Sequence, residues 1–375
     1  MNCVTEVNSI IASLIKAAFL YSNPQTKIRG INLDTQLPKN LPSVIEIKRV
    51  IPSHCFVPST CRSLLYALKD VVQILFAWVL LWYLLPLTNW IALKVLMIFV
   101  YWGIQGTFFM GLFVMGHDCG HGSFSKYRLL NDVVGTISHA FLFVPYYQWK
   151  LTHQNHHKFT GNMDKDEVFY PARASQKPSI NSVLPGFGYG IGWFTYLFIG
   201  YFPRRVSHFN LFDEMFRGHE VACTLSLLTY GMNGTLCYWF YLSYGFKILF
   251  VFYLAPLFIY GSYMVIVTFL HHSEVNIPWY ADQNWNYVKG QLSTIDRNYG
   301  LVHHAIHCIG THQMHHMFTK IPHYHLEEAT RHFRSAFPEL VKSCDEPILS
   351  SFVRMFKKYN QQQVVADNAL EVYYK

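Results

Sequence analysis

The stretch VVQILFAWVLLWYLLPLTNWIALKVLMIFVYWGIQGTFFMGLFVMG, residues 71–116, carries a single charged side chain, Lys94. A helix needs about 20 predominantly apolar residues to cross the hydrocarbon core of a bilayer, so this stretch is long enough for two crossings. The sequence PLTN at 86–89 is a turn signal near its middle. Buried helices of a large soluble protein would rarely stay free of charge over such a length. The stretch therefore predicts a membrane hairpin of two helices, residues 68–86 and 91–116.

Residues 221–273 repeat this pattern, with Lys247 as their one charged side chain and a turn signal, SYG, at 243–245. They predict a second hairpin, with spans at 219–242 and 247–271. Only 14% of the chain is charged, against roughly 25% in an ordinary soluble protein. The expected fold class is an all-α integral membrane protein, with four transmembrane helices arranged as two hairpins and a cytosolic helical cap.

Four spans place the N-terminus, residues 117–220 and residues 272–375 on one side of the membrane. The first 70 residues carry eight Lys or Arg against four Asp or Glu, and an excess of Lys and Arg near span ends marks the cytoplasmic side. We therefore expect a multi-pass protein whose polar segments face the cytosol. The formal net charge of +8 fits contact with anionic membrane lipid, and the chain offers no basic-aromatic module for binding nucleic acid.

The chain divides into a leader, 1–45, one membrane domain, 46–360, and a C-terminal tail, 361–375, which we expect to be loosely ordered like the leader. A further apolar stretch, 186–202, is short for a span, and a fifth crossing would separate the histidine motifs described next. It is expected to form a helix in the membrane interface, followed by Arg204 and its neighbour Arg205 at the headgroups.

Three histidine motifs lie outside the predicted spans: HDCGH at 117–121, HQNHH at 153–157 and HQMHH at 312–316. Residues three and four apart share one face of a helix, so HxxxH aims two imidazoles at one point and HxxHH aims three. Eight nitrogen ligands are too many for one metal ion and suit two. A histidine-rich metal-buffering loop, as in some transporters, would form a low-complexity run. The eight predicted metal ligands are His117, His121, His153, His156, His157, His312, His315 and His316.

Imidazole alone does not identify the metal, because it suits zinc, copper, iron and nickel. The chain lacks the Glu-x-x-His motif of soluble di-iron bundles. A hydrolytic di-zinc site would more often contain a bridging carboxylate and would not require a membrane. Saturated hydrocarbon has no polar group to attack, so a site facing lipid favours a strong oxidant. The pattern indicates an oxygen-activating centre of two iron ions.

The residues around the motifs resemble those of the integral-membrane fatty acid desaturases. The similar segments are GHDCGHGSF at 116–124, the second motif followed by DEVF at 166–169, and GTHQMHH at 310–316 followed by IPHYH at 321–325. The resemblance runs from about residue 51 to 338 and is strongest to the methyl-end branch, the ω-3 and Δ12 desaturases. It implies an endoplasmic reticulum oxidoreductase that uses O2 and two electrons to insert a cis double bond into an unsaturated acyl chain.

The same resemblance implies two non-haem iron ions, a fatty acyl lipid or acyl-CoA as substrate, and cytochrome b5 with its NADH reductase as electron donors. The haem-binding motif HPGG of a fused cytochrome b5 domain is absent, so the donor is expected to be a separate protein. No separate protein acid or base is predicted besides the di-iron centre. Residues 309–312 look more like ω-3 desaturases than Δ12 desaturases. Residues 160–162 and 166–169 instead resemble Δ12 sequences. Taken together, the segments slightly favour ω-3 activity. The alternatives are a fatty acid hydroxylase with the same oxidant and a metal transporter with a cytosolic histidine site.

The family also takes a ninth histidine ligand from just beyond the last span. His272 best matches that position, with His271 as its rival. A tunnel for the acyl chain is expected among span residues such as Trp102, Phe108 and Phe109. Ligating imidazoles commonly donate their second N–H to an outer partner. The candidates for that outer layer are Asp118, Asp164, Asp166, Glu167, His307 and His323, with His307 also an alternative ligand.

Overall fold

The computed structural model describes residues 37–38, 40–176 and 184–374, so most of the predicted leader lies outside the described residues. The first hairpin consists of α3 (Thr60–Leu84), a single 3-10 turn η2 (Leu85–Leu87) and α4 (Ile91–His121). The Ser59 side chain accepts a hydrogen bond from the Arg62 N–H and caps the start of α3. At the other end, η2 and an extended Thr88 reverse the chain where the sequence PLTN predicts a turn.

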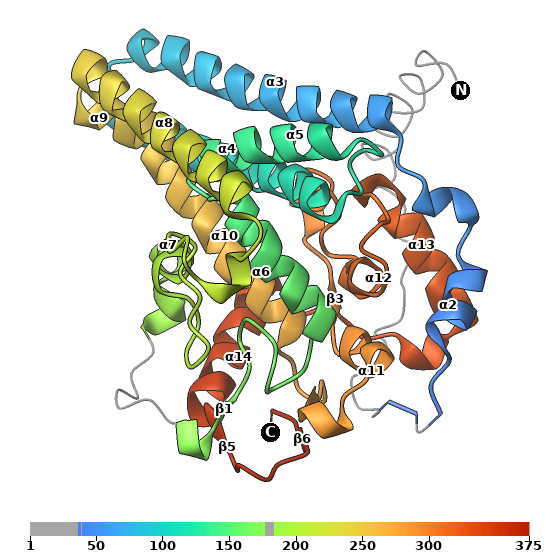
Figure 1. The fold of residues 1–375 in the computed structure, drawn as a ribbon. Coiled ribbons are helices and arrows are strands. Elements are labelled where there is room, and N and C mark those ends of the chain that lie inside the picture. Colours follow the sequence, from blue (N-terminus) through green and yellow to red (C-terminus); the bar gives the residue numbers. More distant parts are fainter. Residues whose placement is uncertain (1–36, 39, 177–183, 375) are drawn as a thin grey trace.

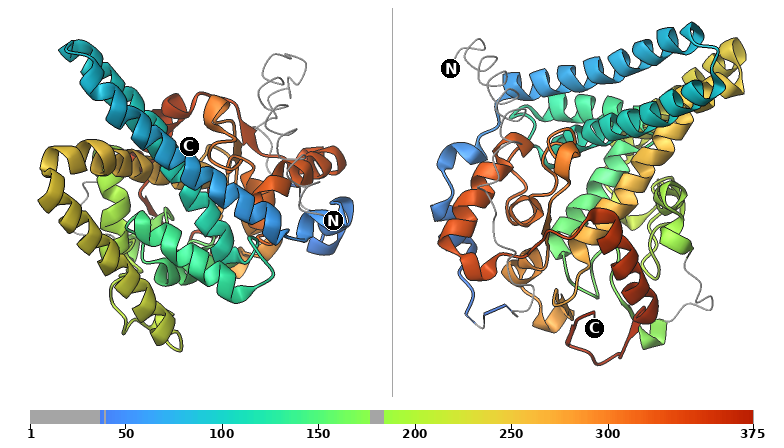
Figure 2. Two further views of the ribbon diagram at one scale, coloured as in Figure 1. Left: turned by 90° about the horizontal axis from the view of Figure 1, so that it is seen from above. Right: turned by 180° about the vertical axis from the view of Figure 1, so that it is seen from behind.

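The second hairpin consists of α8 (Glu220–Tyr244), α9 (Phe246–Leu249), a π-helical turn η6 (Phe250–Leu254) and α10 (Ala255–His272). Gly245, with φ 80°, ends α8 in a conformation that favours glycine. Figures 1 and 2 show the tips of both hairpins projecting together from one end of the molecule.

Three segments of the described chain are long and apolar enough to cross a membrane: Thr60–Leu87, Ile91–His121 and Phe246–His272. Their outer faces expose large apolar side chains such as Leu68, Phe76 and Phe99, as expected where lipid covers the protein. The predicted span at 219–242 is present as helix α8, but α8 falls outside this set of three. It carries the polar residues Thr224, Ser226, Thr229, Asn233, Thr235 and Ser243.

The remaining elements form the cap below the hairpins (Figure 1). The apolar stretch that we expected in the interface, 186–202, forms α7 (Gly190–Ile199), which packs along α10. A Cβ atom on Gly261 of α10 would lie 2.8 Å from the Gly190 carbonyl oxygen, so these two helices touch through glycine. The other helices of the cap are α2 (Val44–Val50), α5 (Arg128–Phe141), α6 (Tyr146–Phe159), α7 (Gly190–Ile199), α11 (Tyr287–Leu292), α12 (His312–Met317), α13 (His323–Ala336) and α14 (Ile348–Gln361), with the 3-10 turns η1 (Ser53–Phe56), η3 (Ala174–Gln176), η4 (Pro185–Gly188), η5 (Glu214–Phe216), η7 (Asp282–Asn284), η8 (Gly300–Val302) and η9 (Pro338–Leu340).

Two strand pairs attach the C-terminal residues to the cap. β1 (Ala172–Arg173) pairs in parallel with β5 (Val364–Val365), and β2 (Trp279–Tyr280) pairs antiparallel with β6 (Glu371–Val372). The side chain of Tyr374 is 3% exposed. The tail is therefore folded against the domain, in contrast to the loose tail that we expected. A third pair joins β3 (Asp296–Arg297) to β4 (Ser343–Cys344) in parallel.

Arg204 is not placed as the sequence predicted. Its guanidinium lies 3.7 Å from the centre of the Tyr170 ring and donates hydrogen bonds to the backbone oxygens of Met163 and Asp166. Carbonyl oxygens and an aromatic face satisfy this group inside the protein. Arg204 therefore holds the loop after α6, instead of lying at the lipid headgroups.

Candidate metal centre

The last turn of α4 presents His117 and His121 on one face, with their Nε2 atoms 3.2 Å apart. The helix ends immediately afterwards, because Gly122 adopts φ 68° and donates its N–H to the carbonyl oxygens of Asp118 and Cys119. Such a left-handed residue is a common helix terminator. The i, i+4 spacing of HDCGH thus produces the convergence that the sequence predicts.

Helix α6 contributes histidines in two directions. His153 and His157 point to the imidazoles of α4, with their own Nε2 atoms 3.0 Å apart, and His315 of α12 joins them with its Nε2 atom 3.2 Å from that of His157. We call this group the first histidine cluster. Its five ligand atoms all lie within 4.8 Å of one another, an arrangement that can hold a metal ion; the members are His117, His121, His153, His157 and His315.

The second histidine cluster gathers side chains from α10 and again from α6 and α12. His156 of α6, His272 at the end of α10 and His316 of α12 place one nitrogen each within 4.8 Å of the others. His312 adds a fourth imidazole, whose Nε2 atom lies 3.2 Å from that of His272. The two clusters together contain all nine histidines that we predicted as ligands.

The protonation pattern of the second cluster fits a bound cation. His156 Nδ1 lies 2.5 Å from the Asp166 carboxylate and donates to it, so its Nε2 atom carries a lone pair. That atom faces the His272 Nε2 atom at 3.3 Å. Thr160 uses its hydroxyl hydrogen on the His156 carbonyl oxygen and therefore accepts from His316 Nδ1 at 3.1 Å. The His316 Nε2 atom is then a buried lone pair without a hydrogen-bond partner among the described residues.

Burial favours the neutral form of five imidazoles on α6 and α12. Burial and the neighbouring histidines hold the pKa of each of these five histidines well below its ordinary range. A neutral imidazole offers a lone pair to a metal ion, and a buried lone pair facing another lone pair is costly without one. The arrangement is consistent with a di-metal site; the five histidines are His153, His157, His312, His315 and His316.

The structure shows which of the two adjacent histidines, His271 or His272, faces the second histidine cluster. Both side chains are buried, but His271 already uses both ring nitrogens. Its Nδ1 atom donates to the Ile295 carbonyl oxygen at 2.5 Å, and its Nε2 atom accepts from the Tyr299 hydroxyl at 3.0 Å. Only His272 directs a free nitrogen into the second histidine cluster.

Carboxylates lie behind both clusters. Asp166 accepts from His156 and from the backbone N–H of Gly161. Asp118 lies 3.6 Å from His117 Nδ1 and 2.9 Å from His323 Nδ1. The Asp166 contact orients His156 in the manner expected of an outer partner. Asp118 hydrogen-bonds His323 and is only an ion-pair neighbour of His117, whose Nδ1 atom has no hydrogen-bond partner among the described residues. The hydroxyl of Thr160 behind His316 was missed, because a single threonine carries no sequence signal for this role.

Two other predicted outer partners differ from expectation. Asp164 pairs with Arg173, whose Nη2 atom lies 3.0 Å away, so its carboxylate is directed to the strand region instead of a cluster histidine. Glu167 accepts a hydrogen bond from the Asn155 amide and borders the cavity described below. Burial raises the pKa of Glu167 to about 7.

His307 lies one layer further out, with its Nε2 atom 2.6 Å from the buried carboxylate of Asp70 in α3. Its ring centre is 4.3 Å from that of His323, which in turn contacts Asp118. His307 is therefore a partner of α3 instead of an alternative ligand. The sequence did not indicate Asp70, which lies 237 residues away from His307.

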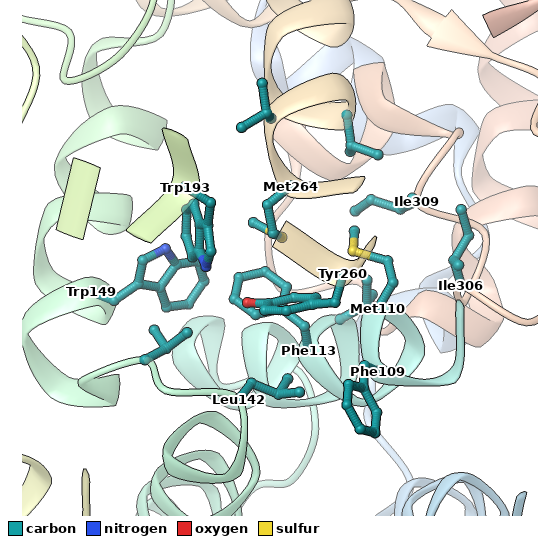
Figure 3. Packing of buried hydrophobic residues seen from close by; sticks show 14 of the residues in the cluster. Phe109, Met110, Phe113, Leu142, Trp149, Trp193, Tyr260, Met264, Ile306 and Ile309 are labelled. Carbon is teal, nitrogen blue, oxygen red and sulfur yellow. The ribbon is translucent and has the colours of Figure 1, made fainter. Parts of the chain in front are cut away.

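A cavity of about 260 Å³ borders both clusters. Its walls come mainly from apolar side chains of α4, α7 and α10, including Phe113, Trp193 and Met264, three of the side chains that Figure 3 labels. Histidines of both clusters form the polar part of the wall: His117, His153, His156, His272, His312 and His316. An apolar chain entering this cavity would lie beside the histidine nitrogens.

The predicted tunnel residues lie elsewhere among the described residues. Trp102 donates its indole N–H to the Val251 carbonyl oxygen, between the two hairpins. Phe109 packs edge-to-face against Phe141, with ring centres 5.3 Å apart. The cavity instead uses α7, because this helix closes over the side of α10 that carries Met264. Trp102, Phe108 and Phe109 therefore do not line this cavity, and their place in an acyl tunnel stays a prediction.

Comparison with known proteins agrees with this geometry. Residues 96–347 match the family described as fatty acid desaturase. The chain is 39% identical over 363 residues to an sn-1 acyl-lipid omega-3 desaturase (ferredoxin) of a Synechocystis strain, covering 94% of this chain and 96% of that protein. It is 37% identical to an omega-3 fatty acid desaturase, endoplasmic reticulum, of Nicotiana tabacum, covering 88% of each. Identity is 36% to an acyl-lipid omega-3 desaturase (cytochrome b5), endoplasmic reticulum, of Arabidopsis thaliana, covering 76% of this chain and 74% of that protein.

Proposed function

Because the chain belongs to the membrane fatty acid desaturase family, whose members are oxygen-dependent oxidoreductases, we propose that it is an omega-3 acyl-lipid desaturase. The observation that carries the proposal is the meeting of two histidine clusters with an apolar cavity. A cavity walled by Phe113, Trp193 and Met264 suits a hydrocarbon chain and excludes water from the nitrogen atoms beside it.

We propose two iron ions as the metals, one in each histidine cluster. Bound iron would supply the oxidising chemistry that, with O2 and two electrons, removes two hydrogens from neighbouring carbons. The chain's own residues hold the ligands in place: Asp166 keeps the proton on His156 Nδ1, and Thr160 accepts from His316 Nδ1. Trp193 and Met264 would position adjacent methylenes of the substrate against the clusters. No separate acid or base is required by this proposal.

The preference for omega-3 over Δ12 activity rests on the relatives named above, which are omega-3 desaturases of an acyl lipid or a fatty acid. Their names also support an acyl lipid as the substrate carrier. For this chain we propose an unsaturated acyl chain that already carries a double bond nearer the carboxyl end, and a new cis double bond on its methyl side.

We propose cytochrome b5, reduced by its NADH reductase, as the electron donor, with the endoplasmic reticulum membrane as the location. The Arabidopsis relative is named for both. Ferredoxin is the alternative donor, because the Synechocystis relative is named for it. The proposed topology keeps four spans, with α8 as the most polar of them, so that both clusters face the cytosol.

Expression in baker's yeast, with and without added linoleate, tests the proposal. Gas chromatography–mass spectrometry should detect α-linolenate only on feeding, and a His316→Ala variant should yield none. Linoleate formed from oleate would indicate Δ12 activity instead, and a hydroxy acid would indicate a hydroxylase. A yeast strain without cytochrome b5 should lose the product, and recovery on co-expression of ferredoxin with its reductase would identify the alternative donor.

A further inference from the structure

A second group of metal-binding side chains lies away from the histidine clusters. It forms where η1 (Ser53–Phe56) packs against α13 (His323–Ala336), on the side of the cap where Figure 1 shows α2 beside α13. His54 and Cys55 come from η1, and His325 and Glu328, one helical turn apart, come from α13. One ligand atom from each of these four residues lies within 4.8 Å of the other three.

The separations within this group match those of a tetrahedral site. His54 Nε2 is 3.0 Å from Glu328 Oε2 and 3.7 Å from Cys55 Sγ, and His325 Nδ1 is 3.8 Å from Glu328 Oε2. Zinc bonds of about 2.0–2.1 Å to nitrogen or oxygen and about 2.3 Å to sulfur place tetrahedral N and O donors about 3.3 Å apart and an N–S pair about 3.6 Å apart. Side-chain rotation can close the wider separations.

We propose that His54, Cys55, His325 and Glu328 bind a zinc-class divalent cation. A thiolate and a carboxylate would neutralise the dication, and two neutral imidazoles would complete a closed set of four ligands, which is typical of structural zinc sites. Arg331 acts on both Cys55 and Glu328, and Arg62 acts on His325. Burial raises the pKa of the Cys55 thiol to about 12, so the bound dication would have to displace the thiol proton. Glu328 pairs with both imidazoles and the rings of His54 and His325 meet edge to face, so these contacts already hold the ligand atoms close together, and a bound cation would take all four at once.

The bound ion would join the segment before α3 to the helix that follows the third histidine motif. α13 begins at His323, whose N–H and Nδ1 both contact Asp118, and Asp118 stands behind His117 of the first histidine cluster. The site would therefore stabilise the outer layer of the first cluster. The His54 side chain is 58% exposed, so an ion can enter from solvent.

Metal analysis of the full-length protein in lipid nanodiscs tests the proposal. Elemental mass spectrometry should find one zinc per chain in addition to the metal of the histidine clusters. Replacing that zinc with Co²⁺ should produce a thiolate-to-cobalt charge-transfer band, because the histidine clusters contain no thiolate ligand. Cys55→Ser should abolish this band, whereas Cys344→Ser, at another buried cysteine, should retain it.

A second variant keeps the test valid if Cys55→Ser fails to fold. His54→Gln changes a mostly exposed side chain and should weaken zinc binding by at least about tenfold, measured by competition with a chromophoric chelator, while iron content stays unchanged. The proposal is overturned if the wild-type protein holds no zinc and gives no cobalt–thiolate band. It is equally overturned if zinc and the band persist in both variants.

Discussion

Replacing His272 with glutamine should remove one of the two metal ions, whereas the same replacement at His271 should leave both. His272 Nε2 lies 3.3 Å from His156 Nε2 and 3.2 Å from His312 Nε2, so the variant reduces the second histidine cluster from four imidazoles to three. Loss of an outer partner already weakens metal binding by about 10–100-fold. Loss of a direct ligand should cost at least about 100-fold, equivalent to about 2.8 kcal/mol.

His271→Gln is the matched control, because it makes the same side-chain change at the adjacent residue. His271 bonds the Ile295 carbonyl oxygen and the Tyr299 hydroxyl, and each such hydrogen bond contributes about 0.5–1.5 kcal/mol net. His271→Gln should therefore lower the free energy of unfolding by about 1–3 kcal/mol at most, because the amide can replace part of the pair. Its iron content should not change.

The assay is iron per chain after dialysis against a weak chelator, combined with thermal unfolding and product analysis in yeast. We expect His272→Gln to retain about one iron and to lose desaturation, and His271→Gln to retain two with a lower unfolding midpoint. Loss of iron in His271→Gln together with full iron in His272→Gln would refute the reasoning, because it would reverse the two roles.

Three further results are expected. Asp118→Asn should weaken iron binding about 10–100-fold, measured by chelator competition, while Asp164→Asn, whose carboxylate faces Arg173, should not. Thr268→Trp, which fills the cavity from α10, should lower conversion roughly 100-fold by displacing the substrate without changing iron content. Glu274→Gln should lower the free energy of unfolding by about 3–5 kcal/mol in thermal or denaturant unfolding, because it leaves the buried Arg297 guanidinium, 2.8 Å away, without its charge partner.

The family and the enzyme class could be predicted from the sequence and are confirmed by the comparisons. Both depend on local patterns. The i, i+4 spacing of His117 and His121 places two imidazoles on one face in any α-helix, and the apolar stretch at 71–116 is long enough for two spans whatever packs against it.

The predicted span at 219–242 shows how far a prediction from charge alone reaches. Residues 219–242 are free of charge except at Glu220, and they do form most of helix α8. Hydroxyl and amide side chains nevertheless make α8 less apolar than the three spans that meet the criteria of length and composition. Absence of charge correctly predicts the helix, and its crossing of the membrane stays part of the proposed topology.

What the sequence determined by itself is the helices of the two hairpins and the direction in which neighbouring histidines point within a helix, because helical periodicity is a local property. Only the tertiary structure decided which imidazoles share a cluster. It divides the motif of α6 between two clusters and selects His272 over His271 through the carbonyl oxygen of Ile295. It also brings Asp70 to His307 and closes the cavity with Trp193. These contacts join segments far apart in the chain, and their geometry depends on how helices pack, which residue spacing within one helix does not specify.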